Sequence, residues 1–338
     1  MVSEAPPFWW EKPDWRAWSL YPLSWSYGAV AARRMVTAKR VPIDLPVICV
    51  GNFTVGGTGK TPVSIALAKE AARQGLKPGF LSRGHGGSFS QPHLVDLGHD
   101  SAKHVGDEPL LLARHGLVAV TPDRVEGARL LLRHGCDILI MDDGFQSARI
   151  RIDYALVVVD ARFGLGNGHV IPGGPLRAPL IQQMRFADGV LRMGQGDAAE
   201  RAIRLASRAG KAVFDASIAP EEDPGLQGRR FLAFAGIGHP EKFFDTVRNA
   251  GGRVEREKPF PDHHFYGSED ISNLWKAAQD EGLQLITTAK DAVRLNHEVA
   301  PPEFLENLTV LDVEARFDNP QTPARIVAYA REAWRRRR

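Results

Sequence analysis

Cysteine is scarce in this chain, and the scarcity bounds both its compartment and its architecture. Only Cys49 and Cys136 occur in 338 residues, and they stand far apart in two apolar runs. Two such residues cannot form a disulfide framework, and they are typical of buried thiols in a reducing compartment. We therefore expect a cytoplasmic setting.

Long hydrophobic runs are also missing. No stretch of about 20 uninterrupted apolar residues occurs, which argues against a transmembrane helix. Charged residues interrupt the stretch in which a secretory signal would have its apolar core, namely Glu4, Glu11, Lys12 and Asp14. We expect neither a membrane span nor an export signal.

Charge of one sign is not concentrated either. The chain has 43 Lys and Arg against 40 Asp and Glu, a net charge of +3. The basic residues are spread along the sequence, so nucleic acid is not the favoured partner. The arginine run at 335–338 is interpreted as a solvated tail, with an anchor for anionic lipid as the alternative.

The composition that is present belongs to a folded globular protein. Apolar residues make up 43% and charged residues 25% of the chain, which is ordinary for such proteins. A length of 338 residues allows a substantial core. At roughly 150 residues for each domain, it predicts two domains.

The first forty residues are rich in aromatic side chains. They hold five of the seven tryptophans, which are Trp9, Trp10, Trp15, Trp18 and Trp25. Beyond Pro22, one helical face collects Leu23, Tyr27, Val30 and Ala31, and Arg33 and Arg34 follow. This pattern predicts an amphipathic helix at a membrane surface, with rings at the interface and cations near anionic lipid. A helix packed on its own domain is the alternative.

A glycine-rich segment, GNFTVGGTGKT at 51–61, follows the apolar run at 46–50. It departs from the phosphate-loop pattern G-x-x-x-x-G-K-[ST] only at Thr54, where a glycine is usual. Backbone amides there can face phosphate oxygens, Lys60 can reach the terminal phosphates, and the Thr61 hydroxyl can bind magnesium. The predicted nucleotide-binding residues are Val55, Gly56, Gly57, Thr58, Gly59, Lys60 and Thr61. A structural glycine turn without a ligand is the alternative.

Short apolar runs alternate with helical segments, which predicts a wound parallel sheet of the P-loop NTPase kind. The expected strands are 46–50, 79–81, 118–121, 138–141, 155–159, 189–191 and 212–214, and the expected helices include 109–115 and 125–134. Ligands bind at the carboxyl ends of such strands. The run at 138–141 ends in Asp142 and Asp143, whose carboxylates suit a magnesium nucleotide, although a simple turn is the alternative.

Two further loops carry candidate polar residues. Asp107 lies in the segment GDEP, where helix capping is the alternative to a catalytic role. His263 lies in PDHHFY at 261–266, and surface histidines are the alternative there. Because no third ligand accompanies the two histidines, zinc is not expected.

Taken together, these segments resemble the tetraacyldisaccharide 4'-kinase family. The matching motifs are VGNFTVGGTGKTP (50–62), LSRGHGG (81–87), VGDEPLLLA (105–113), DDGFQ (142–146), IPGGPLRAP (171–179), FPDHHFY (260–266) and TTAKDAVRL (287–295). The resemblance implies transfer of the ATP γ-phosphate to the 4' hydroxyl of a lipid disaccharide 1-phosphate, with ATP and Mg²⁺ as cofactors. It also implies a peripheral position on the cytoplasmic face of the inner membrane, and the aromatic N-terminus agrees with the family's membrane-contacting helix.

The same resemblance implies roles for single residues. Lys60 matches the family's phosphate-binding lysine and Thr61 its magnesium-binding threonine. The acidic pair at the metal corresponds to Asp142 and Asp143.

Asp107 corresponds to the family's proposed general base and His263 to its histidine partner. A sugar hydroxyl is a poor nucleophile at neutral pH, so a carboxylate that accepts its proton is chemically sensible. Two positions depart from the family pattern: Ser147 stands where histidine is common, and Ala178 replaces a glutamate. Roles of those two side chains in relatives are not carried over.

We expect four parts in the chain: a membrane-contacting segment at 1–40, a nucleotide-binding domain at 41–228, a smaller α/β domain at 229–319 that closes over it, and a helix with a basic tail at 320–338. A linker is expected at 219–225, strands at 231–235 and 284–288, and helices at 240–250 and 320–337. The alternative function is a nucleotide-driven switch or an ATPase without lipid phosphotransfer. Guanine selectivity is not supported, because TTAKD at 287–291 lacks the asparagine of the Asn-Lys-x-Asp element.

Overall fold

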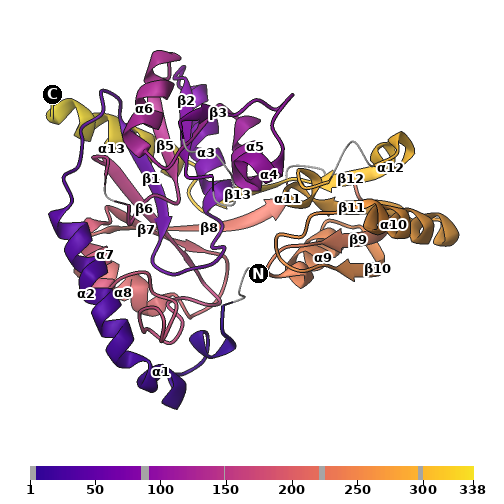
Figure 1. Cartoon of the computed structure of the whole chain (residues 1–338), viewed down its shortest axis with the longest axis horizontal. Coiled ribbons are helices and arrows are strands. Elements are labelled where there is room, and N and C mark those ends of the chain that lie inside the picture. Colours follow the sequence, from indigo (N-terminus) through magenta and orange to yellow (C-terminus); the bar gives the residue numbers. More distant parts are fainter. Residues whose placement is uncertain (1–4, 85–90, 148, 221–224, 296–299) are drawn as a thin grey trace.

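The computed structural model shows that the chain folds into two β-sheets, each packed with its own helices (Figure 1). The structure describes residues 5–84, 91–147, 149–220, 225–295 and 300–338. We call the nine-stranded sheet and its helices the larger lobe, and the four-stranded sheet and its helices the smaller lobe. The smaller lobe extends to the right of the larger one in Figure 1.

The larger sheet has the strand order β13-β8-β7-β6-β1-β5-β2-β4-β3. Neighbouring strands in this sheet are parallel except at its two edges. There, β3 runs antiparallel to β4 and β13 runs antiparallel to β8. The strands are β1 Val47–Asn52, β2 Pro78–Ser82, β3 His93–Leu94, β4 Leu117–Val120, β5 Ile138–Asp142, β6 Tyr154–Asp160, β7 Gly189–Met193, β8 Ala212–Pro220 and β13 Val313–Phe317. Because β1 lies between β5 and β6, the loop that follows it emerges at the middle of the sheet.

Helices cover both faces of this sheet, which is why its central strands are continuously apolar. Val47 and Cys49 of β1 contribute to one core, and Ile48 and Val50 contribute to the other. The first core is covered by α2 Tyr21–Thr37, α6 Arg124–Arg133, α7 Leu180–Phe186 and α8 Glu200–Arg208. The second is covered by α3 Lys60–Arg73, α4 Ala102–Val105, α5 Asp107–Ala113 and α13 Thr322–Arg336.

The smaller sheet is parallel throughout and has the order β10-β9-β11-β12. Its strands are β9 Arg230–Ala235, β10 Arg253–Pro259, β11 Gln284–Thr288 and β12 Leu308–Leu311. Its helices are α9 Pro240–Asn249, α10 Ser268–Glu281, α11 Ala289–Ala292 and α12 Pro302–Glu306. Separate apolar clusters lie on its two faces, so the smaller lobe has a core of its own.

The N-terminal segment runs along the outside of the larger lobe (Figure 1). It consists of a 3-10 turn at Pro7–Trp9, α1 Trp15–Ser19 and α2. Ser24, Gly28 and Met35 form the inner face of α2, and the Ser24 hydroxyl accepts a hydrogen bond from the Gly173 amide at 2.9 Å. Among the residues that the structure describes, every helix is too short or too polar to span a bilayer.

Most of the expected strands and helices are present with small shifts at their ends. The expected linker at 219–225 is wrong at its start, because β8 continues to Pro220 and pairs with β13; residues 221–224 lie outside the described part. Residues 313–317 fall inside the smaller domain that we expected at 229–319, but they form β13, an edge strand of the larger sheet. The expectations missed the strands β3, β10, β12 and β13 and the helices α4, α7, α10, α11 and α12. The strand β10 escaped notice because its polar and charged residues are largely exposed, which leaves no apolar run.

Candidate functional site

The predicted phosphate loop lies between β1 and the first turn of α3. Gly59 precedes the helix with φ 83° and Gly56 has φ 101°, a conformation that side chains with a Cβ rarely adopt. The loop is therefore shaped by its glycines, and the N–H groups of the first helical turn remain available for an anion. The expected strand, loop and helix are all found.

Polar atoms around this loop lack partners within the described residues. The Asn52 side-chain oxygen and the Thr58 hydroxyl are both buried and make no hydrogen bond there. Lys60 is buried, with Nζ 3.5 Å from the Gly56 carbonyl oxygen and 3.8 Å from Asp143 Oδ2. Buried polar groups normally have partners. The unpaired Thr58 hydroxyl and the enclosed lysine can donate to an anionic ligand, whereas the Asn52 oxygen can only accept a hydrogen bond.

Asp142 ends β5 next to the loop. Its Oδ2 accepts a hydrogen bond from the Thr61 hydroxyl at 3.1 Å, and its Oδ1 accepts one from the Ser64 hydroxyl at 3.1 Å. Burial, together with the negative charge of Glu108, raises the Asp142 pKa to about 7. A buried carboxylate that is costly to ionise gains most from a nearby cation, and hydroxyl and carboxylate oxygens are ligands that Mg²⁺ accepts.

Asp143 is held differently. Both of its oxygens accept hydrogen bonds from Arg177, Oδ1 from Nη1 at 2.6 Å and Oδ2 from Nη2 at 2.9 Å. Burial raises the Asp143 pKa, but the charges of Lys60 and Arg177 outweigh it, and the pKa lies below its usual value. The two predicted metal carboxylates therefore have distinct surroundings.

Asp107 and His263 lie together although they come from different lobes. Asp107 is the first residue of α5, and His263 lies in the loop after β10. His263 Nδ1 lies 3.5 Å from Asp107 Oδ2. Burial alone would raise the Asp107 pKa; the hydrogen bond with His263 and the charges of Lys290 and Arg294 nevertheless hold it far below the usual range.

Backbone strain coincides with this site. Among the described residues, the non-glycine positions with positive φ are Asp143, at 51°, and His263, at 59°. Such conformations cost free energy and often occur at functional positions. Both residues were predicted as site residues from the sequence.

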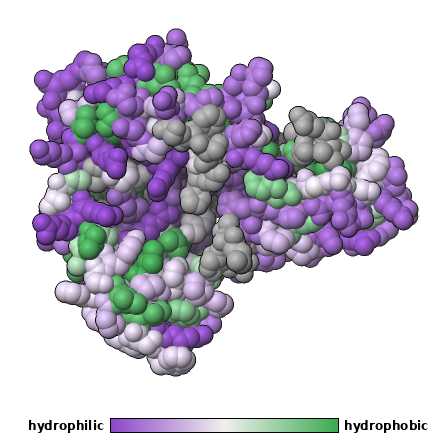
Figure 2. Space-filling model, viewed as in Figure 1, coloured by the Kyte–Doolittle hydropathy of each residue, from purple (hydrophilic) through white to green (hydrophobic). Residues whose placement is uncertain are grey.

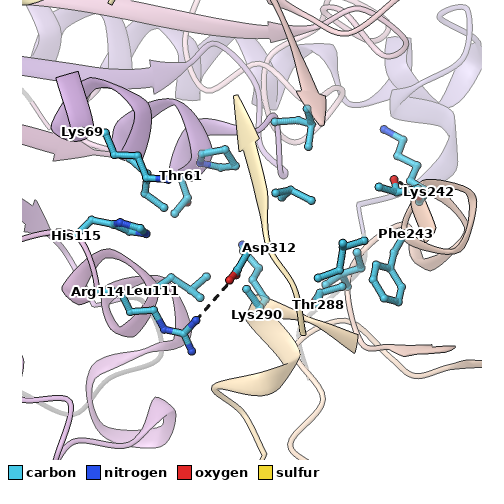
Figure 3. Close-up of a pocket in the computed structure, with 18 residues that line it drawn as sticks. Thr61, Lys69, Leu111, Arg114, His115, Lys242, Phe243, Thr288, Lys290 and Asp312 are labelled. Carbon is cyan, nitrogen blue, oxygen red and sulfur yellow. Dashed lines mark hydrogen bonds and ion pairs between the residues drawn. The ribbon is translucent and has the colours of Figure 1, made fainter. Parts of the chain in front are cut away.

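A cavity of about 350 Å³ opens beside the loop between the two lobes (Figure 3). Figure 3 shows Thr61 and Lys69 of α3 on one side and Lys242 and Phe243 of α9 on the other. The other apolar residues that line it are Pro62, Ile65, Leu111, Ile218, Ile237, Ala289, Leu311 and Val313. Its size and largely apolar lining are typical of a small-molecule site, and Lys69, Lys242 and Lys290 are among the basic residues that also line it.

Comparison with known proteins decides the family. The Tetraacyldisaccharide-1-P 4'-kinase model matches residues 16–331. Tetraacyldisaccharide 4'-kinase from Mesorhizobium japonicum is 62% identical and covers 100% of this chain and 99% of its own length. The kinase of the same name from Chelativorans sp. is 57% identical over 99% of this chain and 98% of its own length. The chain belongs to the tetraacyldisaccharide 4'-kinase family.

A solved structure of this family has the same fold. The crystal structure of LpxK from Aquifex aeolicus in complex with ATP superimposes with a TM-score of 0.73 at 25% identity, covering 93% of this chain and 99% of that one. The expected class, a P-loop α/β fold with a second, smaller α/β part, is confirmed.

The two residues that depart from the family pattern make local contacts. The Ser147 hydroxyl donates to the Gly144 carbonyl within its own turn at 2.7 Å. Ala178 is fully buried, and its carbonyl accepts a hydrogen bond from Gln183 Nε2 at 2.7 Å. Neither side chain reaches the groups described above.

Arg177, Lys290 and Arg294 are charged site residues that the sequence reasoning did not single out. The motifs LRAP and TTAKDAVRL contained them. Their partners are distant in sequence: Arg294 and Asp107 are separated by 187 residues. Two arginines and a lysine inside conspicuous motifs were the signal that could have drawn attention to them.

Proposed function

We propose that this chain is an ATP-dependent kinase that phosphorylates the 4' hydroxyl of tetraacyldisaccharide 1-phosphate, a step of lipid A biosynthesis. Family membership over residues 16–331 supports the reaction and its lipid disaccharide acceptor. The observation that supports it best is that the phosphate loop and the Asp107–His263 pair are linked through charge. Thr61 is bonded to Asp142, Asp107 pairs with His263 of the other lobe, and Glu108, next to Asp107, interacts electrostatically with both Asp142 and Lys60.

The phosphate loop, Val55 to Thr61, binds the triphosphate through its amides, and Lys60 neutralises charge on the terminal phosphates. Asp107 accepts the proton of the acceptor hydroxyl while the oxygen attacks the γ-phosphorus and ADP leaves. His263 orients this carboxylate. The His263 pKa is raised, first because of its hydrogen bond with Asp107.

Thr61 and Asp142 fit a magnesium ion, because their oxygens lie 3.1 Å apart beside the loop. Bound Mg²⁺ supplies charge neutralisation for the phosphates. Asp143 was also expected at the metal, yet both of its oxygens are bonded to Arg177. We therefore assign the direct contacts to Thr61 and Asp142, and give Asp143 the supporting role of holding Arg177 and Lys60 at the loop.

The cavity between the lobes suits the base and ribose of ATP. It begins at Thr61 and Pro62, directly beyond the loop that holds the phosphates, and it is walled by apolar side chains from both lobes. A flat, largely apolar base buried there would leave its phosphates at Lys60. Residues of both lobes would then contact one nucleotide, which favours closure and exclusion of water.

The N-terminal segment supports a peripheral position at the cytoplasmic face of the inner membrane. Trp15 is 76% exposed and Trp25 67% exposed. Other exposed apolar and aromatic residues of α1 and α2 are Trp18, Tyr21, Leu23, Tyr27, Val30 and Val36. Figure 2 shows hydrophobic residues on the lower part of the larger lobe, where these helices lie in Figure 1. Such a surface is typical of interfacial helices.

The test is a transfer assay with purified protein, γ-labelled ATP, magnesium and detergent-dispersed tetraacyldisaccharide 1-phosphate. We expect a new phosphomonoester on the lipid, stoichiometric with the ADP released. Release of ADP without a labelled lipid would favour the alternative, a nucleotide-driven switch or ATPase. Replacing Lys60 with Ala is expected to lower turnover and weaken ATP use together.

A further inference from the structure

Arg294 is a buried cation between the two lobes that the proposed mechanism has not used. Its side chain is 1% exposed. Nε and Nη2 both donate to Asp107 Oδ2, the Nε bond measuring 3.0 Å. Nη2 also lies 3.3 Å from His263 Nδ1. One guanidinium therefore contacts both members of the Asp107–His263 pair.

The smaller lobe fixes this guanidinium from behind. Nη1 donates to the Gly236 carbonyl at 2.6 Å and to Asp291 Oδ1 at 3.3 Å. The same Gly236 carbonyl accepts the His263 amide at 3.1 Å. Arg294 and His263 are thus held by one carbonyl, so their relative position is set by the smaller lobe alone.

Asp291 is itself fully buried and saturated with donors. It accepts hydrogen bonds from the Tyr266 hydroxyl at 2.9 Å, the Gly236 amide at 3.0 Å and the Thr288 hydroxyl at 2.6 Å. A buried carboxylate with this many donors is held in one position. The chain Tyr266–Asp291–Arg294 therefore presents a preorganised fork to Asp107.

We propose that Arg294 is a positioning residue for phosphoryl transfer: it holds the Asp107 carboxylate of the larger lobe against His263 of the smaller lobe. Asp107 Oδ1 is occupied by the Glu108 amide at 2.9 Å, so Oδ2 is the oxygen that faces His263 and Arg294. Without the fork, the side chain could rotate away from His263. The inference rests on the proposed role of Asp107.

An arginine is required because the contact with Asp107 depends on the fixed geometry of two N–H donors as well as on positive charge. Lys290 supplies a second cation in the same region, donating from Nζ to Glu108 Oε1 at 2.9 Å. If the arginine were lost, Lys290 would still supply positive charge near Asp107, but the two-pronged contact would be gone. The charged groups that face the Asp107–His263 pair are Glu108, Asp262, Lys290, Asp291 and Arg294.

The test is Arg294→Lys in the full-length protein, which keeps the positive charge and removes the fork. We expect kcat to fall by about 10- to 100-fold while KM for ATP changes by less than about threefold, because general-base catalysis is impaired and the phosphate loop is intact. In ¹³C-histidine NMR titrations, the His263 pKa is expected to fall, since contact with Asp107 is the main cause of its elevation.

Arg337→Lys is the matched control. Arg337 also forms a buried two-pronged pair, with Asp153, but lies in the C-terminal segment away from the site. The Arg337→Lys variant should have a lower melting temperature, with kcat and the His263 pKa unchanged. If Arg294→Lys changes neither kcat nor the His263 pKa, or loses activity only in proportion to a fall in stability that Arg337→Lys reproduces, the proposal is wrong.

Tyr266→Phe keeps the test decisive if Arg294→Lys does not fold. It removes only the hydroxyl that steadies Asp291, and we expect a smaller fall of kcat, about two- to fivefold, with the same direction of change at His263. An unchanged kcat and His263 pKa in this variant would overturn the proposal. Failure of the proposed function is separate, because it would appear as an absence of lipid phosphorylation by the unaltered protein.

Discussion

Asp107 and His263 illustrate how the surroundings of two side chains shift their pKa values in opposite directions. The His263 pKa is raised above its ordinary value, first through the hydrogen bond with Asp107 and against the effect of burial. The Asp107 pKa is held far below its usual range, so the carboxylate is ionised at every pH at which the protein would be assayed. Such reciprocal shifts are expected of a charge-assisted pair.

Replacing Asp107 with Asn should therefore change His263 measurably. The amide keeps the size of the side chain and removes the negative charge, so the His263 pKa should fall toward its ordinary value of about 6.5. The kcat for lipid phosphorylation should fall by about 10²- to 10⁴-fold, with ATP affinity nearly unchanged. Histidine NMR and steady-state kinetics would measure the two effects. An unchanged His263 pKa would show that His263 and Asp107 are not coupled.

Some site residues could be predicted from sequence because their chemistry is local. Lys60 and Thr61 stand in one short loop after an apolar run, and Asp142 closes another apolar run, so pattern alone indicates a strand end and a nucleotide. The contact between Asp107 and Arg294 depends on how two lobes meet, which no local pattern specifies. The family resemblance supplied Asp107 and His263, and geometry was needed to find Arg294.

At the scale of single elements, α1 and α2 keep aromatic side chains exposed while small residues face the protein. Gly28 lies where an added Cβ would come within 3.4 Å of Pro179, so the inner face of α2 is packed closely. The tryptophans consequently point outward. Sequence periodicity predicted the helix and its apolar residues. It could not predict whether other parts of the protein would cover the apolar face of the helix.

Changing Trp15, Trp18 and Trp25 together to Gln should weaken binding to vesicles that contain anionic lipid by about tenfold or more, because the rings contribute most of the apolar area available to the interface. Cosedimentation would measure it, with detergent-dispersed substrate activity expected to stay near the unaltered level. The control replaces three exposed leucines elsewhere in the chain, Leu97, Leu117 and Leu132, with Gln. Equal binding by both triple variants would contradict a membrane role for α1 and α2.

The C-terminal helix α13 is attached to the start of the central strand through Arg337, the residue that follows the helix. Arg337 donates to both oxygens of Asp153, at 2.7 and 3.0 Å, and Asp153 Oδ2 also accepts the Val47 amide at the start of β1. Both side chains are nearly buried. The arginine run, interpreted from sequence as a solvated tail, therefore contains at least one structural residue.

Arg337→Met should lower the free energy of unfolding by about 3 kcal/mol, because it leaves the buried Asp153 carboxylate without its cation. The neighbouring Arg338→Met is the control, since Arg338 and Asp44 are both exposed, and exposed pairs contribute less than about 1 kcal/mol. Urea denaturation of the two variants would measure the difference. Similar losses for both would show that the buried pair has no special importance.

At the scale of the whole molecule, the site depends on how the two lobes are placed relative to each other. Both the ion pairs and the cavity are formed by residues of the two lobes together. Asp107 and Glu108 pair with Arg294 and Lys290 on one side. Lys242 of the smaller lobe lies 3.6 Å from Asp160 of the larger lobe as a further contact. Since buried pairs between the lobes depend on close approach, opening would separate the proposed base from its histidine partner while leaving the phosphate loop intact.

Filling the cavity should therefore hinder nucleotide binding without unfolding either lobe. Ile218 of β8 is 39% exposed and lines the cavity, with Cδ1 3.4 Å from the position of a Cβ on Gly59. Ile218→Trp would place an indole where we propose that the base lies, so we expect KM for ATP to rise about tenfold or more, as for the loss of a well-packed apolar contact.

Leu117→Trp is the matched control, because Leu117 is similarly exposed on β4 of the same sheet and does not line the cavity. Isothermal titration with a non-hydrolysable ATP analogue would separate binding from turnover, and thermal melts of both variants should stay close to that of the unaltered protein. If Ile218→Trp bound the analogue as tightly as Leu117→Trp, the base would have to lie elsewhere. The cavity would then serve lobe closure alone, and closure would have to be driven by the phosphates and the acceptor rather than by the base.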